Sequence, residues 1–466
     1  MQPLTRRDFL TLAGVGYIWP SELKRYPDPA TDLDVSLLTN PAFIYFGAVL
    51  LARGASFFLI PLYTRRLTPV EYGDYTLGQT VLGTLPGVMT LGIHSALSRF
   101  FFETPDLEEA KARAGTVARW HLLLALASAA LFELLVLAAC PRSGTPLGGR
   151  WELTCIVIAC AGACIALIPG SYMRTTQRPL WAAAFQLVEF ACVVTAGLTF
   201  VNVLSRGLRG AFEAWFAAYG VLGVVGTLFI LGLPGKWSPA VLRRALHFSL
   251  PLVPHLLANQ LQNIADRWTL KATGLDAQLG PYALAVQVTS PAQLLVGAYN
   301  DGAAPRMGEL VSQGGLGAVE RSIQAIRRRY VMVATLGAIL VVAAIPIAKH
   351  LIAPKFHEAL WLSPFLCAVV LVESLYYPNL NVVYFASETK IIPRITFSAA
   401  ALNVALNIVF IRYAGVAGAI AARAISMTYR SVAMWIAAGA CFRRAAALAA
   451  DLPTVGSTLP LEGAAK

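Results

Sequence analysis

Long apolar runs recur along nearly the whole chain and are separated by short polar segments. A helix needs about 20 mainly apolar residues to cross the hydrocarbon core of a bilayer. About twelve runs reach this length, so the pattern predicts an all-α membrane protein with no separate soluble domain. The predicted spans are 38–62, 74–101, 118–140, 152–172, 180–204, 211–233, 245–270, 280–304, 330–353, 359–386, 391–412 and 416–442.

The composition agrees with this pattern. Hydrophobic residues make up 57% of the chain and charged residues 13%, against about 25% charged in a typical soluble domain. The net charge of +12 does not indicate a nucleic-acid partner, because the basic residues lie mostly in the short loops. With the N-terminus inside, the cytoplasmic segments carry more than twice as many Lys and Arg as the outside loops. We therefore expect a multi-pass protein of the cell inner membrane with both termini in the cytoplasm.

Two nine-residue segments of the chain resemble each other. Residues 73–81 (GDYTLGQTV) and 280–288 (GPYALAVQV) share Gly, Tyr, Leu and the final Val at an offset of 207. An even number of predicted spans separates the copies, so both copies have the same orientation in the membrane. The repeat predicts two six-helix lobes, 38–233 and 245–442, related by an axis along the membrane normal. A chance match in a chain rich in Gly, Leu and Val is the alternative.

The two ends of the chain lie outside the predicted spans. We expect 443–466 to form a cytoplasmic tail, and 1–37 to be either a cytoplasmic tail or the product of an overextended start. Residues 5–10 (TRRDFL) resemble a twin-arginine export signal, but the apolar part that follows is short. The seven cysteines show no metal-binding spacing. Cys140 and Cys155 flank one short loop and could either form a disulfide or remain inert thiols.

Charged residues interrupt several of the apolar runs. Arg53 lies near the middle of the first predicted span. The other charges of this kind are Arg99, Glu133, Glu189, Asp266, Arg267, Asp301 and Glu373. A charged side chain in hydrocarbon is costly unless it faces a polar cavity or a partner, so a charged interior indicates that the protein moves a polar solute.

Longer stretches of sequence resemble a known family. Residues 53–75 read RGASFFLIPLYTRRLTPVEYGDY, and 91–102 read LGIHSALSRFFF. Together with Asp266-Arg267 followed by LGPYAL, and with NVALN and GVAGAI between 403 and 420, they resemble the polysaccharide transporter (Wzx-type flippase) branch of the multidrug/oligosaccharidyl-lipid/polysaccharide exporter superfamily. The resemblance covers 38–442. It implies two lobes around a central cavity that work by alternating access.

The same resemblance implies the substrate and the partners. Members of this branch translocate undecaprenyl-diphosphate-linked oligosaccharides for the synthesis of surface polysaccharides such as O-antigen and exopolysaccharide. We therefore expect this substrate, membrane lipid and other polysaccharide-assembly proteins as partners. We expect neither a cofactor nor a bound metal, and no enzymatic activity.

The in-span arginines suit the diphosphate of such a substrate. A guanidinium stays charged and binds two phosphate oxygens at once. We predict Arg53, Arg99 and Arg267 as substrate-binding residues, although Arg99 could simply lie at the membrane interface. For the sugar we predict Asn259 and Asn263, which share one face of an unusually polar span. Hydrogen bonding between helices is the alternative for these two amides.

In-span carboxylates could couple transport to an ion gradient. A buried carboxylate holds its proton more tightly than an exposed one and can carry it between states. The candidates are Glu189, Glu373, Glu133 and Asp266. We place Glu189 first, because no Lys or Arg lies within one helical turn of it. Each carboxylate could instead neutralise an arginine of another helix.

Three other functions remain open at this point. A drug or organic-cation antiporter of the same superfamily would need an acidic, aromatic cavity, against which the arginines argue. A polysaccharide polymerase or ligase would need a large outside loop, and the predicted outside loops are short. The third alternative is a scaffold in a polysaccharide-assembly complex.

Overall fold

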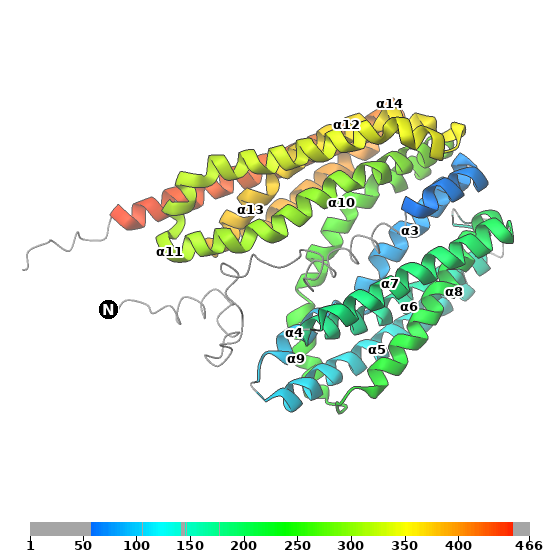
Figure 1. The fold of residues 1–466 in the computed structure, drawn as a ribbon, viewed down its shortest axis with the longest axis horizontal. Helices are drawn as coiled ribbons and strands as arrows, with labels where there is room; N and C mark the ends of the chain where they lie inside the picture. The colour runs from blue at the N-terminus through cyan, green and yellow to red at the C-terminus, as the bar shows by residue number, and fades with distance from the viewer. Residues whose placement is uncertain (1–56, 105, 141–144, 146, 177, 451–466) are drawn as a thin grey trace, which may run out of the picture.

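The computed structural model describes residues 57–450 except 105, 141–144, 146 and 177 (Figure 1). Within this part of the chain every regular element is a helix. An isolated β-bridge between Thr145 and Gly148 is the one pairing of extended backbone in these ranges. The predicted all-α fold is therefore confirmed for the described residues.

We call the elements before residue 250 the N-half and the later ones the C-half. The N-half consists of a helix at 57–66, α3 (Pro69–Met89), α4 (Ser95–Phe101), α5 (Leu107–Ala139), α6 (Arg150–Thr175), α7 (Pro179–Gly197), the π-helix η1 (Leu198–Val203), α8 (Gly207–Gly232) and α9 (Pro239–Ser249). The C-half consists of α10 (Leu252–Ala272), α11 (Asp276–Leu351), the short 3₁₀ helix η2 (Pro354–Phe356), α12 (His357–Ser374), α13 (Tyr376–Phe385) and α14 (Ile391–Ala450).

Two long C-half elements are helical hairpins. The backbone φ is positive at Gly315 in α11 (63°) and at Gly415 in α14 (53°), and the chain reverses direction at both (Figure 1). Across the α11 turn, the hydroxyl of Tyr330 donates to Oδ1 of Asn300 at 3.0 Å. Hydrogen bonds join the two arms of α14 in the same way. Residues 305–329, between two predicted spans, are thus helical and continuous with the arms of the first hairpin.

The second predicted span is divided in two. α3 ends at Met89 and α4 begins at Ser95, and between them Leu91 and Gly92 have positive φ values of 50° and 66°. Left-handed backbone conformations cannot continue a right-handed helix. The apolar composition of this stretch gave no sign of the break.

The seventh predicted span is also interrupted. It begins earlier than predicted, as α9, and is divided from α10 at Leu250 and Pro251. Seven helices of the described part are long and apolar enough to cross a membrane, judged by length and composition, and neither α3 nor α10 is among them. The twelve-span, two-lobe layout therefore stays a prediction.

Some predictions fall partly or wholly outside the described residues. The structure does not describe 1–37 or 451–466, so the predictions about these tails stay open. Cys140 and Cys155 are described, and both are free thiols. The structure thus favours the second of the two possibilities raised for this pair.

The two halves meet where α3 and α11 begin. Gly73 of α3 packs against the side chain of Leu279, which would lie 3.0 Å from a Cβ added to this glycine. Gly280 of α11 packs against the backbone of Pro69, and a Cβ added to Gly280 would clash with the Pro69 carbonyl oxygen. Nearby, the Tyr72 hydroxyl donates to a Gln287 side-chain oxygen at 2.8 Å. The first residues of the two copies, Gly73 and Gly280, therefore both lie at the boundary between the halves. We call this region the closed end.

Away from the closed end the two groups of helices diverge. In Figure 1 they lie close together near the start of α3 and farther apart toward α11 and α4. α10 runs from one group to the other and carries many polar residues. At the closed end, Thr68 and Glu71 form a capping box that fixes the first turn of α3.

Candidate functional site

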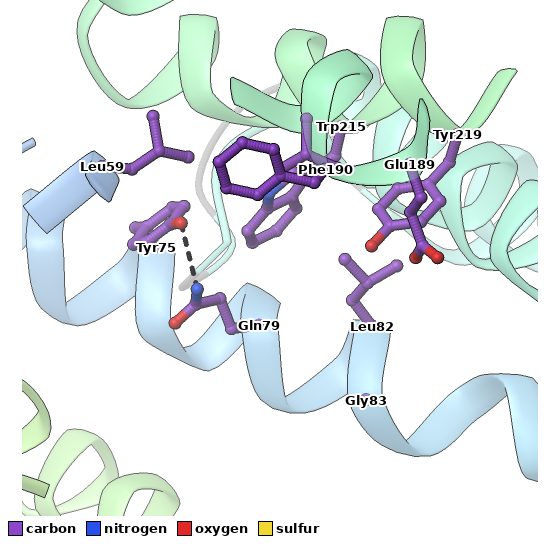
Figure 2. Close-up of a pocket in the computed structure, with 10 residues that line it drawn as sticks. Leu59, Tyr75, Gln79, Leu82, Gly83, Glu189, Phe190, Trp215 and Tyr219 are labelled. Atoms are coloured by element: carbon purple, nitrogen blue, oxygen red, sulfur yellow. Dashed lines mark hydrogen bonds between the residues drawn. The ribbon is translucent and has the colours of Figure 1, made fainter. Parts of the chain in front are cut away.

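A cavity of about 260 Å³ lies inside the N-half (Figure 2). Residues of the helix at 57–66, α3, α7 and α8 line it. Its lining residues are Leu59, Tyr75, Gln79, Leu82, Gly83, Glu189, Phe190, Val193, Trp215 and Tyr219. Most of this wall is aromatic or aliphatic, so a charged group within it has few polar neighbours.

Glu189 is the charged group of this cavity. Its carboxylate lies beside the hydroxyl of Tyr219 in Figure 2, while Gln79 donates to the Tyr75 hydroxyl at 3.0 Å on another part of the wall. No ion pair to Glu189 occurs among the residues that the structure describes. Since an acid in such surroundings binds a proton or another cation readily, Glu189 has the setting expected of a coupling group.

The polar face of α10 makes hydrogen bonds to both halves. Toward α3, Gln260 donates to the backbone oxygen of Gly83 at 2.9 Å, and the Trp268 indole donates to Thr80 at 3.1 Å. Toward α14, Gln262 accepts from Arg430 at 3.1 Å. These three residues of α10 thus serve hydrogen bonding between helices. The bonds do not involve Asn259 or Asn263, so both alternatives for those two amides stay open.

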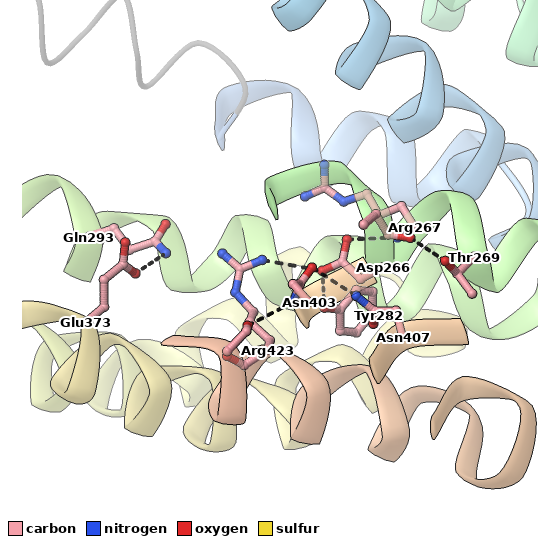
Figure 3. Close-up of polar contacts among 11 residues, drawn as sticks. Asp266, Arg267, Thr269, Tyr282, Gln293, Glu373, Asn403, Asn407 and Arg423 are labelled. Atoms are coloured by element: carbon pink, nitrogen blue, oxygen red, sulfur yellow. Dashed lines mark hydrogen bonds and ion pairs between the residues drawn. The ribbon is translucent and has the colours of Figure 1, made fainter. Parts of the chain in front are cut away.

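Asp266 is the centre of a buried polar cluster between α10, α11 and α14 (Figure 3). The Tyr282 hydroxyl donates to Asp266 at 2.5 Å, and Arg423 forms an ion pair with it at 3.4 Å. The side chains of Asp266 and Arg423 are only 2% and 5% exposed. Asp266 was a candidate for ion coupling, and the structure gives it a fixed cationic partner.

Two asparagines extend this cluster along α14. Asn407 donates to Asn403 at 3.0 Å, and Asn403 donates to Ser426 at 3.0 Å. Both asparagines belong to the NVALN motif. Their amide groups therefore join the two arms of the α14 hairpin beside the ion pair.

Arg267 points in a different direction from its neighbour. In Figure 3 its guanidinium extends away from the Asp266–Arg423 pair. The positive charge of Arg267 interacts electrostatically with Tyr72 on α3. Its Nε atom is buried, and no described residue accepts a hydrogen bond from it. A cation that lies between the halves with hydrogen-bonding capacity left over can bind an anionic group.

The other predicted residues lie in more ordinary surroundings. The Arg99 side chain is 55% exposed at the end of α4, where it lies over Phe248 and 3.7 Å from Glu103. Glu133 accepts from Thr154 at 2.7 Å. These contacts suit positions at helix ends and between neighbouring helices, and they leave the predicted roles untested.

Four further predicted residues lie in the C-half or outside the described residues. Glu373 accepts a long hydrogen bond of 3.4 Å from Gln293. Asn263 is exposed and takes part in a polar contact. Arg53 and the side chain of Asn259 lie outside the described part of the structure, so their predicted roles stay predictions.

Two arginines of the site were not predicted to have a role. Arg423 and Arg430 are seven residues apart, so they lie on one face of α14, and both reach α10. Their spacing inside an apolar run was the available signal. Among the described residues, no group of three or more His, Cys, Asp or Glu side chains is placed to hold a metal ion.

The long apolar helices, the charges between them and the two diverging halves define a polytopic membrane protein. The family model described as "Polysaccharide biosynthesis protein" matches residues 38–311, which is more than half of the chain. The chain belongs to this family. No curated protein sequence matches it.

Solved structures share the fold at low sequence identity. An inward-facing multidrug resistance MATE family transporter of the MOP superfamily superposes with a TM-score of 0.70 and 12% identity, covering 88% of this chain and 99% of the other. The lipid II flippase MurJ in an inward closed conformation gives 0.64 and 12%, covering 85% and 87%. An outward-facing MATE transporter gives 0.56 and 14%, covering 88% and 95%. This chain therefore has the fold of these transporters.

Proposed function

We propose that the protein is a flippase that moves a diphosphate-linked oligosaccharide lipid across the cytoplasmic membrane for polysaccharide synthesis. Membership of the polysaccharide biosynthesis family gives the process, and the fold shared with MATE transporters and with a lipid II flippase gives the class of activity. Neither the family nor the fold suggests an enzyme. The observation that carries the proposal is the Arg267 guanidinium between the halves, with a buried Nε that no described residue binds.

Arginine is suited to the diphosphate for a physical reason. A diphosphate that leaves water must exchange its hydration for other hydrogen-bond donors, and a guanidinium offers several in one plane. Arg267 is within electrostatic range of Tyr72, so a headgroup bound to it would lie near the contact between the halves. The prediction for Arg53 completes this proposal, with a second cation contributed by the first span.

Alternating access follows from the arrangement of the halves. They are in contact at the closed end and diverge at the other, so a substrate would enter from the diverging side. The orientation predicted from loop charge places the closed end outside and the diverging end in the cytoplasm. The higher TM-score with the inward-facing MATE transporter than with the outward-facing one, 0.70 against 0.56, supports the same assignment.

Glu189 is the proposed coupling residue. Its carboxylate lies in an aromatic cavity within one half, so a cation bound there would change the internal packing of that half. Binding a proton removes the cost of an unpaired charge in apolar surroundings, and releasing it restores that cost. The cavity could thereby favour different arrangements of the halves before and after the ion crosses.

The cavity around Glu189 also favours a second candidate function. One carboxylate among Tyr75, Phe190, Trp215 and Tyr219 is a setting in which an organic cation can bind by cation–π contacts. An organic-cation antiporter would use this cavity as its substrate site. Arg267, at the boundary between the halves, favours the anionic lipid.

One experiment separates the two functions. Purified protein in proteoliposomes is given either a fluorescent lipid-diphosphate oligosaccharide or a fluorescent quaternary ammonium ion. We expect translocation of the lipid and no concentrative transport of the cation. Cation transport without lipid translocation would replace the flippase proposal with the antiporter.

A further inference from the structure

A lysine with two carboxylate partners lies at the closed end. Lys271 is in the last turn of α10, and its Nζ lies 2.6 Å from Oδ1 of Asp74 and 3.0 Å from Oδ1 of Asp276. The side chains of Lys271 and Asp74 are 16% and 15% exposed, and that of Asp276 is 39% exposed. The group is therefore shielded from water at its centre and open to water on the side of Asp276.

The two ion pairs differ in what they connect. Asp74 is on α3 in the N-half, so its pair with Lys271 crosses the boundary between the halves. Asp276 begins α11 in the C-half, five residues after Lys271 and joined to it by a short turn. Only the first pair must break when the closed end opens, because the second moves as one unit.

The neighbouring carboxylate is already occupied. Glu71, one turn before Asp74 on α3, accepts hydrogen bonds from the backbone nitrogen and the hydroxyl of Thr68 at 2.8 and 2.9 Å. It belongs to the capping box of α3. Asp74 is thus the N-half carboxylate that faces Lys271.

We propose that Lys271 is a latch of the closed end that exchanges its carboxylate partners. In the closed state Asp74 and Asp276 share the ammonium group, and in the open state Asp276 alone holds it. The proposal rests on the alternating access described above. It goes further because it assigns Asp74 and Asp276 opposite effects on the equilibrium between the closed and the open state.

The opposite effects follow from the cost of an unpaired charge. An ammonium group that loses its carboxylate in partly buried surroundings is destabilised. Asp74 lowers the free energy of the closed state alone, whereas Asp276 becomes the sole partner in the open state. Removing Asp74 should therefore favour opening, and removing Asp276 should favour closure. An ion cluster that served only general stability would respond in the same direction to both changes.

The rate of thiol labelling at a buried reporter measures opening. Leu279 is fully buried against Gly73 of the other half, so a Leu279→Cys thiol becomes reachable only when the closed end opens. The two partly exposed native cysteines, Cys140 and Cys192, are replaced in this background. The full-length protein in lipid nanodiscs is treated with a membrane-impermeant maleimide. The maleimide concentration is kept low enough that the labelling rate is proportional to it.

We expect Asp74→Asn to raise the labelling rate about fivefold and Asp276→Asn to lower it by a similar factor, the size of a weak coupling between sites. Lys271→Gln should raise the labelling rate as Asp74→Asn does, because it removes the same Lys271–Asp74 ion pair. It serves as the second test of this ion pair if the Asp74 variant does not fold. Lys349→Met removes an exposed lysine that has no ion pair among the described residues, and it should leave the rate unchanged.

Two results would overturn the latch. One is a change in the same direction for both carboxylate variants, and the other is no change for either. The assay contains no substrate, so its outcome is independent of the flippase proposal. Opposite shifts in a protein that translocates no lipid would retain the latch and reject the flippase.

Discussion

The two halves of the molecule treat a carboxylate inside an apolar helix in opposite ways. In the C-half, Asp266 is held by Arg423 and by the hydroxyl of Tyr282 in a site closed to water. In the N-half, Glu189 lines a cavity and has no cationic partner among the described residues. Both acids are in-span candidates by sequence. The comparison teaches that the charge itself does not reveal a role, whereas its neighbours do.

The difference has an energetic meaning. A paired buried charge resists change, because removing one partner leaves the other uncompensated. An unpaired carboxylate in a cavity can gain or lose a proton or cation without breaking a bridge. The C-half cluster is thus suited to holding α10 against α14, and the N-half cavity is suited to a change during transport.

The largest expected effect is the loss of the C-half pair. Asp266→Asn leaves the Arg423 guanidinium buried without its counter-charge, so we expect a loss of about 3–5 kcal/mol in the free energy of unfolding. Unfolding of the purified protein in mixed micelles with increasing SDS measures it. The double variant Asp266→Leu with Arg423→Met removes both charges and should recover most of the loss. Near-wild-type stability of the single variant would remove the distinction between the halves.

The next effect concerns transport rather than stability. Arg267→Ala should lower lipid translocation at least about tenfold, because a charge-assisted contact to the diphosphate is lost, while unfolding stays close to wild type. Arg267→Lys should recover only part, since a point charge does not bind two phosphate oxygens in one plane.

Arg412→Ala is the matched control for this change. Arg412 is exposed near the turn of the α14 hairpin and has no ion pair among the described residues. It should retain full translocation. Full activity of Arg267→Ala would leave the substrate proposal without its principal residue.

The repeat offers a direct comparison of equivalent positions in the two halves. A Cβ at Gly280 meets the backbone oxygen of Pro69, whereas one at Gly73 meets the side chain of Leu279 at 3.0 Å. Backbone yields less readily than a side chain, so Gly280→Ala should cost about 1–3 kcal/mol and Gly73→Ala less. Thermal unfolding in detergent measures both. Gly302→Ala, with nothing within 4 Å of its Cβ, is the control, and equal losses for Gly73 and Gly280 would contradict the asymmetry.

The smallest effect on stability is expected at Glu189. Glu189→Gln should change the free energy of unfolding by less than about 1 kcal/mol, because no ion pair is lost. Translocation should slow and become insensitive to an imposed pH difference across proteoliposomes. A wild-type rate that ignores both the proton and the sodium gradient would remove the need for a coupling carboxylate. A stability loss as large as that of Asp266→Asn would show that Glu189 has a structural partner.

The sequence by itself determined the helical class, the apolar elements and the positions of most in-span charges. Apolar runs and interrupting charges are local properties, and they can be read from consecutive residues. The sequence also contained the repeat, although it could not show that Gly73 and Gly280 lie where the two halves touch. It missed the break at 90–94, because a left-handed turn at Leu91 leaves no mark in hydropathy.

Only the tertiary structure decided which charges are paired. Asp266 and Arg423 are 157 residues apart, and no local pattern connects them. The same is true of Lys271 and Asp74, whose contact depends on how α10 packs against α3. A charge in hydrocarbon must find a partner, but the packing of distant helices decides which partner it finds, and that packing is a property of the whole fold.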